Sequence, residues 1–187
     1  GKKLLENSHA PEKSILAMAA KYNVPVYTSS PGDSSIGMNV AYLRYKNKNI
    51  IVDPNLDVLE TAAIVFNSAK NGVIIVGGGS PKNFYLQTQP FISQIAGLPH
   101  IGHDFDIQIS TDAPHWGGLS GATPSEAVSS GKINPNELKN SVVVYSDATI
   151  SLPILVGYVL NEMNARESKQ LYGKIPEFMT KFENKIL

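Results

Sequence analysis

The residues best suited to chemistry lie in one stretch, Gly117 to Lys132, which reads GGLSGATPSEAVSSGK. Thr123 and Glu126 form a T-x-x-E capping box with a proline at the first helical position, which predicts that a short helix begins there. Gly131 offers a left-handed exit from this helix, and Lys132 follows at once. The sequence therefore presents one amine beside a glycine-rich loop, with a carboxylate upstream on the same helix.

Two interpretations of this amine and carboxylate are open. Lys132 could complement the carboxyl end of the helix, while Glu126 only completes the cap. A lysine can also act as a nucleophile once it has lost its proton, and a carboxylate can bind a cationic amine. The surrounding elements decide which interpretation the rest of the chain favours.

Helices and short apolar strands alternate along the chain. Strands are predicted at residues 24–28, 49–52, 73–76, 103–111 and 141–145. Helices are predicted at 11–22, 53–70, 80–95, 123–132 and 151–163, with one more between the first two strands and a helical tail at 165–187. Helices between apolar strands indicate an α/β fold with a parallel sheet. We expect one domain over residues 1–187.

Polar and glycine-rich loops follow the predicted strands. They hold Asp33, Gly77 to Gly79, Thr111 to Gly121, and Asp147. Such loops gather at one edge of a parallel sheet, where open α/β folds bind ligands. The GGGSP segment joins a strand to a helix start and could receive phosphate groups, although a tight turn would need the same glycines. Asp33 could equally cap a turn.

Composition excludes several classes of function. The 187 residues include 16 basic and 16 acidic side chains, so a broad basic surface for nucleic acid is not expected. Cysteine is absent, which removes disulfides, thiolate metal sites and a cysteine nucleophile, and we expect no metal. No apolar run reaches the length of a membrane span, and no signal peptide is visible, so we expect a cytoplasmic protein without a membrane partner.

Four segments carry a resemblance to a known family: GDSSIG (32–37), IIVGGGSPKNF (74–84), GGLSGATPSEAVSSGKI (117–133) and VVVYSDATISLP (142–153). They resemble the deoxyhypusine synthase family, which includes homospermidine synthases and bacterial deoxyhypusine synthase-like proteins. The resemblance implies a Rossmann-like, doubly wound sheet with helices on both faces, NAD as cofactor, and homotetramers with active sites between subunits. It also implies transfer of a 4-aminobutyl group from spermidine, through a lysine imine, to a protein lysine or putrescine.

The resemblance assigns roles to individual residues. Lys132 aligns with the imine-forming lysine, and Glu126 aligns with a carboxylate that holds the substrate's cationic amine. The positions that align with dinucleotide contacts are Asp33, Gly78, Thr111, Asp112, Asp147 and Ala148. On the substrate side we expect Asn83, Gly117, Gly118, Leu119 and Ser130, and from their place in the same loop also His115 and Trp116. We expect the Lys132 amine to project into a closed cavity beside the dinucleotide, at the junction of neighbouring subunits.

The chain departs from the family pattern at several of these positions. Ser130 replaces a tryptophan that packs on the polyamine, and Leu119 and Met38 replace aspartates that bind substrate. Asn83 replaces a histidine. Trp116 could supply an aromatic wall instead, or it could be a hydrophobic anchor for its loop. His115 could shuttle protons or simply be solvated.

Family members are considerably longer, and the chain begins Gly1-Lys2-Lys3 without methionine. We therefore expect a C-terminal portion or processed product that would expose an apolar sheet edge and associate with another chain. The leading hypothesis is an NAD-dependent aminobutyltransferase. The second is a catalytically impaired paralogue or subunit that binds NAD and completes a partner's active site. A classical NAD dehydrogenase ranks lower, because the G-x-G-x-x-G pattern is absent.

Overall fold

A small parallel sheet lies at the centre of the computed structural model, which describes all 187 residues. Its strands lie in chain order, namely β1 (Gly72–Val76), β2 (Phe105–Ser110) and β3 (Ser141–Tyr145). In the central strand, Gln108 is in register with Ile75 on one side and Val143 on the other. Three of the five predicted strands are thus confirmed, and the α/β class with a parallel sheet holds.

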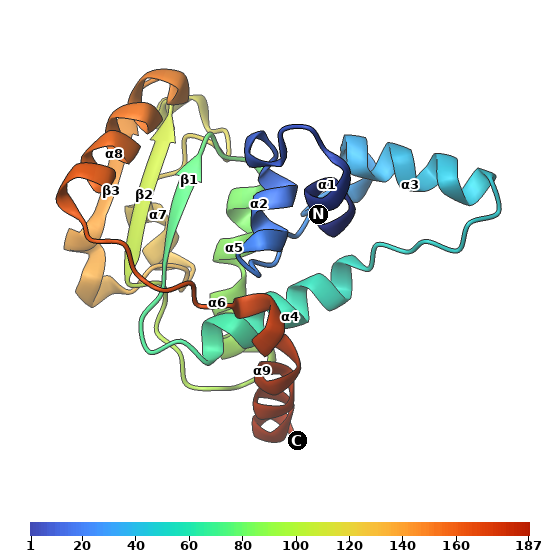
Figure 1. Cartoon of the computed structure of the whole chain (residues 1–187). Helices are drawn as coiled ribbons and strands as arrows, with labels where there is room; N and C mark the ends of the chain where they lie inside the picture. The colour runs from blue at the N-terminus through green and yellow to red at the C-terminus, as the bar shows by residue number, and fades with distance from the viewer.

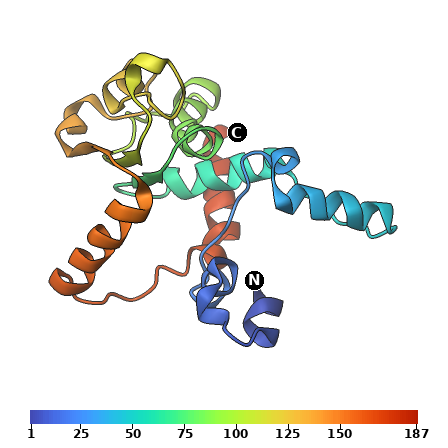
Figure 2. The same ribbon diagram turned by 90° about the horizontal axis from the view of Figure 1, so that it is seen from above.

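Helices connect the strands and cover both faces of the sheet. From β1 to β2 the chain passes through α5 (Ser80–Leu86), α6 (Thr88–Pro90) and the π-helix η3 (Phe91–Ile95). From β2 to β3 it passes through η4 (Pro114–Trp116), α7 (Pro124–Ser129) and η5 (Pro135–Asn140). After β3 comes α8 (Ala148–Glu162). Figures 1 and 2 show α8 on one face of the sheet and the α5 and α7 crossovers on the other.

The main hydrophobic core lies beside the sheet, between α4 (Pro54–Phe66) and the C-terminal helix α9 (Leu171–Ile186). Asp53 starts α4 by accepting hydrogen bonds from two backbone N–H groups, as its position before a proline predicts. Phe182 of α9 is 1% exposed and packs on Ala63 and Ile92. The predicted helical tail is therefore an amphipathic helix that closes this core.

The N-terminal quarter is helical and lies apart from the sheet (Figure 1). It consists of α1 (Lys2–Asn7), η1 (Pro11–Lys13), α2 (Ile15–Lys21), η2 (Pro31–Asp33) and α3 (Ser35–Tyr45). The helix α1 was not predicted. In both ribbon views α3 projects away from the rest of the chain.

Two strand predictions were wrong. Residues 24–28 and 49–52 are extended but pair with no strand. A short apolar segment becomes a strand only when a neighbour takes its backbone hydrogen bonds, and neither segment has one here. Val24 and Val26 accordingly remain 46% and 50% exposed. Apolar composition showed that these segments are extended but could not show whether a partner is present.

Much apolar surface stays open to solvent. Only 23 of the 187 residues are buried, and α8 buries none of its residues although it is rich in apolar side chains. On α8, Ile154 and Leu160 are 69% and 77% exposed. None of the helices combines the length and apolar character that crossing a membrane requires.

Candidate functional site

The loops that follow the three strands meet at one edge of the sheet. Because the strands are parallel and in register, Gly77, Thr111 and Ser146 all lie just beyond their carboxyl ends. The Gly77 N–H also donates to the Ile109 carbonyl across 2.8 Å, which joins the first loop to β2. This edge is where parallel α/β sheets bind ligands.

The glycine run at this edge is required by close packing. A Cβ on Gly78 would lie 2.5 Å from the Cα of Ser120, so only glycine lets the first loop lie against the second. Gly77 and Gly79 have φ values of 85° and 78°, in the left-handed region, and open space faces both. The run is thus both a tight turn and an open backbone surface before α5.

A third segment reaches the same place from the N-terminal part of the chain. The Ser80 hydroxyl hydrogen-bonds the hydroxyls of Ser29 and Ser30 at 3.0 and 3.1 Å. Asp33, the last residue of η2, is exposed a few residues further on. The structure therefore brings the segment holding Asp33 to the start of α5.

The loop after β2 has a polar base and an exposed tip. At the base, Asp112 accepts a hydrogen bond from the Ala113 N–H, and a Cβ on Gly118 would lie 3.0 Å from the Asp112 carboxylate. At the tip, Trp116 is 73% exposed and its ring lies 4.5 Å from that of His115. Trp116 therefore does not anchor its loop to the interior of this chain, and the anchor interpretation is wrong.

The capping box of α7 is present as the sequence predicts. The Thr123 hydroxyl accepts from the Glu126 N–H at 3.3 Å, and the Glu126 carboxylate accepts from the Thr123 N–H at 3.0 Å. Glu126 is exposed, and only its Oε2 takes part in this bond. Capping thus engages Glu126 but leaves its second oxygen free to accept another donor.

The amine of Lys132 does not complement the end of α7. Its backbone is fixed by two hydrogen bonds, from its own N–H to the Ala127 carbonyl and from the His103 N–H to its carbonyl. Its half-buried side chain runs to α5, where Nζ donates to Asn83 Oδ1 at 2.7 Å. The capping interpretation of this lysine is therefore wrong, because the ammonium contacts another helix.

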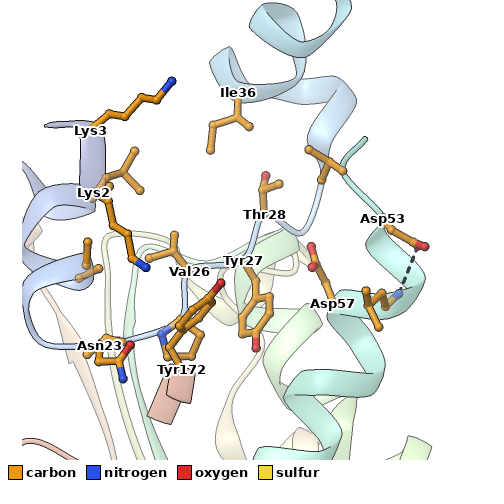
Figure 3. Close-up of a pocket in the computed structure, with 18 of the residues that line it drawn as sticks. Lys2, Lys3, Asn23, Val26, Tyr27, Thr28, Ile36, Asp53, Asp57 and Tyr172 are labelled. Carbon is orange, nitrogen blue, oxygen red and sulfur yellow. Dashed lines mark hydrogen bonds between the residues drawn. The ribbon is translucent and has the colours of Figure 1, made fainter. Parts of the chain in front are cut away.

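Two cavities flank this region. One of about 410 Å³ is lined by Asn83 and Leu119, together with Phe84 and Ser80. Asn83 therefore links this cavity to the Lys132 amine. The other, of about 810 Å³, is lined in part by the unpaired segment 24–28, as Figure 3 shows, and none of the predicted catalytic or substrate-side residues lines it.

The structure also places three other predicted residues, Asp147, Ala148 and Ser130. Asp147 caps α8 by accepting hydrogen bonds from the Thr149 side chain and backbone, which lower the pKa of Asp147. Ala148 is the first residue of that helix. Ser130 is exposed, and its hydroxyl donates to the Ala127 carbonyl. No hydrogen bond or ion pair joins these residues to Lys132.

Two buried polar residues behind the site were not predicted as site residues. Lys82 of α5 and Gln108 of β2 are 6% and 2% exposed, and their side chains are hydrogen-bonded to each other at 2.9 Å. Lys82 lies in the quoted SPKNF motif, but a lysine in an amphipathic helix is normally solvent-facing. The only available signal was Gln108, a polar residue that lies between two isoleucines in β2.

Comparison with known proteins shows the family of the chain. The family described as deoxyhypusine synthase matches residues 1–159. The chain belongs to the deoxyhypusine synthase family. A deoxyhypusine synthase-like protein of Nostoc punctiforme is 51% identical over 177 residues, covering 92% of this chain and 45% of that protein. A probable deoxyhypusine synthase 2 of Methanosarcina acetivorans is 47% identical over 153 residues, covering 82% of this chain and 43% of that protein. The chain thus spans about half the length of these deoxyhypusine synthase relatives.

Proposed function

We propose that the protein is an NAD-dependent aminobutyltransferase that uses Lys132 as its covalent carrier. The observation that supports this most directly is the position of the Lys132 amine, 2.7 Å from an amide that lines a cavity. The family membership supports the reaction class, because the Gly117–Lys132 block lies within the matched region.

The residues at the carboxyl edge suit a dinucleotide. Gly77 and Gly79 leave open backbone surface before α5, where a phosphate could approach. Asp33, Thr111 and Asp112 are the polar side chains that we assign to the cofactor at this edge, with Gly78, Asp147 and Ala148 alongside. NAD supplies a hydride acceptor for the first step and a hydride donor for the last.

The chain's own chemistry centres on making Lys132 a nucleophile. Oxidation of spermidine beside its secondary nitrogen gives a carbon–nitrogen double bond, which the neutral amine attacks. Loss of 1,3-diaminopropane leaves the four-carbon unit as an imine on Lys132. The acceptor amine then displaces Lys132, and hydride addition completes the new carbon–nitrogen single bond.

Asn83 can orient this lysine but cannot deprotonate it. Its amide oxygen accepts a hydrogen bond from the ammonium, yet an amide is too weakly basic to take the proton. The proton must therefore pass to another group, for which His115 or an amine of the substrate is available. Glu126, with one free oxygen, is the carboxylate that we assign to a substrate ammonium.

We also propose that the protein works as an assembly, a homotetramer or a complex with a chain that supplies the other half of the family length. The exposed apolar face of α8 and the unpaired segment 24–28 support association, because both leave apolar surface in water. Sedimentation of the purified protein tests this proposal. A monomer at micromolar concentration would contradict it.

A second candidate is a catalytically impaired paralogue that binds NAD beside an active partner. It rests on three substitutions at substrate-side positions, Ser130, Leu119 and Met38. Met38 is 66% exposed on α3 and Leu119 is 42% exposed. Fewer carboxylates at these positions mean fewer cationic nitrogens bound.

Borohydride trapping separates the two candidates. The intact protein is incubated with NAD and ¹⁴C-labelled spermidine, putrescine or agmatine, reduced, digested and mapped by mass spectrometry. We expect a reduced four-carbon adduct on Lys132, absent without NAD and absent in Lys132→Arg. The surface variant Lys181→Arg serves as the matched control. Protein that binds NAD but gives no adduct with any of the amines would favour the impaired paralogue.

A further inference from the structure

Lys82 is a buried lysine that forms no ion pair, although the Asp106 and Glu126 carboxylates lie near enough to oppose the effect of burial on its pKa. Its side chain is 6% exposed, and it takes part in neither of the two ion pairs in the chain. Burial lowers its pKa. An ammonium in a protein interior is unfavourable, and an apolar side chain of similar length would fill the same space without that cost. The polar contacts of Lys82 therefore need an explanation beyond packing.

Those contacts use all three ammonium protons. Nζ donates to Gln108 Oε1 at 2.9 Å, to the Leu119 carbonyl at 3.2 Å and to the Ala122 carbonyl at 2.5 Å. Gln108 extends the set, because its Nε2 donates to the Ser120 carbonyl at 2.5 Å. Two interior side chains thus hold three carbonyls of one loop segment, residues 119–122.

The same segment is held from its other side by the glycine run, where Gly78 lies against Ser120. Leu119 of this segment lines the cavity of about 410 Å³. The neighbour of Lys82 in α5 is Asn83, which binds the Lys132 amine. One turn of α5 therefore fixes both a cavity wall and the proposed nucleophile.

We propose that Lys82 is a positioning residue for the aminobutyl transfer, acting with Gln108 to fix the 119–122 wall relative to Lys132. This inference rests on the proposed function. A compact ammonium suits the task because three acceptors converge on one nitrogen. A guanidinium spreads its donors over a planar fork and cannot satisfy the same three oxygens.

The test compares Lys82→Met and Lys82→Arg with the wild-type intact protein. Trp116, the single tryptophan, lies in the same loop and reports the mobility of that loop through its fluorescence anisotropy. We expect both variants to lower the rate of Lys132 adduct formation about a hundredfold, since small misplacements near reacting groups have effects of that order. We expect both to lower the fluorescence anisotropy of Trp116, because a loop that is held less firmly moves faster.

Two controls separate positioning from general stability. Lys181→Met removes a surface lysine, and Val65→Ala weakens the distant α4 core without touching the loop. Both should keep the wild-type adduct rate and Trp116 signal. Adduct formation at the wild-type rate in Lys82→Met, or its restoration in Lys82→Arg, would overturn the inference.

The same experiment distinguishes a failure of the proposed function from a failure of the role proposed for Lys82. If the wild-type protein forms no adduct, the transfer proposal fails and the Trp116 measurement decides the role of Lys82 alone. An unchanged signal in Lys82→Met would then refute positioning of the loop. A lowered Trp116 anisotropy confined to the Lys82 variants would support it.

Discussion

Asn83 and Lys132 are 49 residues apart in sequence, yet their side chains meet in a 2.7 Å hydrogen bond. The bond joins the first turns of α5 to the segment just after α7. It connects two of the motifs by which the chain resembles its family, SPKNF and the Gly-Lys pair. No other hydrogen bond and no ion pair involves the Lys132 amine, so Asn83 is its one polar partner in the chain.

Replacing Asn83 with leucine should slow Lys132 chemistry without unfolding the protein. Hydrogen bonds to charged groups contribute about 1.5–3 kcal/mol, which corresponds to a fall in adduct rate of about tenfold to a hundredfold. Borohydride trapping measures the rate, and thermal unfolding should shift by only a few degrees. Asn7→Leu on the exposed helix α1 is the control. Equal rates in both variants would show that Asn83 does not orient the lysine.

Glu126 has a capping role and a proposed substrate role, and one substitution separates them. Gln can replace Glu in a capping box, so Glu126→Gln should keep the stability of α7 while removing the charge. We expect an unchanged melting temperature and a KM for polyamine raised about tenfold, because a charge-assisted hydrogen bond is lost. Thr123→Ala should do the reverse, losing about 1 kcal/mol of stability with KM unchanged. A normal KM in Glu126→Gln would leave Glu126 with the cap alone.

Gly78 and Gly157 differ in the space that each leaves for a Cβ atom. An added Cβ at Gly78 would meet the Ser120 backbone at 2.5 Å, whereas nothing lies within 4 Å of one at Gly157 in α8. Gly78→Ala should destabilise the protein by about 1–3 kcal/mol and disturb the Trp116 loop. Gly157→Ala should stabilise it by about 0.4–1 kcal/mol, since alanine favours the helix. Urea unfolding followed by far-UV circular dichroism gives both values.

Sequence patterns predicted the local structure of the site well. The capping box at Thr123, the left-handed Gly131 and the uniformly apolar β1 are each determined by a few neighbouring residues, and all three are present. The loops at the sheet edge could be placed because parallel strands end together. These features need no knowledge of distant parts of the chain.

What sequence could not predict depends on distant partners. The sequence around Val24 and Val26 is typical of a strand. A strand also needs an adjacent strand to take its backbone hydrogen bonds, and the structure has none at this place. The direction of Lys132 depends on Asn83, and the burial of Lys82 depends on three oxygens that come from β2 and its following loop. A lysine's charge predicts exposure, and only tertiary structure shows when hydrogen bonds outweigh that tendency.

Two buried titratable groups in the sheet region should give opposite pH dependence. Burial raises the pKa of Asp106 from 3.8 to about 6, and its Oδ1 has no hydrogen-bond partner. Burial lowers the pKa of His103 from 6.5 to about 4. Stability from Asp106 is present at low pH and is lost as pH rises through 6. Stability from His103 is present above pH 6.5 and is lost as pH falls through 4. In the wild-type protein the two effects nearly cancel between pH 4 and 6.5.

Replacing Asp106 with asparagine should separate the contribution of His103 to stability from that of Asp106. The variant removes the buried carboxylate charge, so it should be more stable than wild type at pH 7 by roughly 3 kcal/mol, the size of a two-unit pKa shift. The advantage should shrink as the wild-type carboxyl takes up its proton, and it should vanish near pH 4. With Asp106 gone, the His103 effect stands alone, so the variant should lose stability steadily from pH 6.5 to 4. Urea unfolding of both proteins at half-unit pH steps measures the difference directly. A stability difference that stays constant across this range would mean that Asp106 does not titrate near pH 6 in the folded protein.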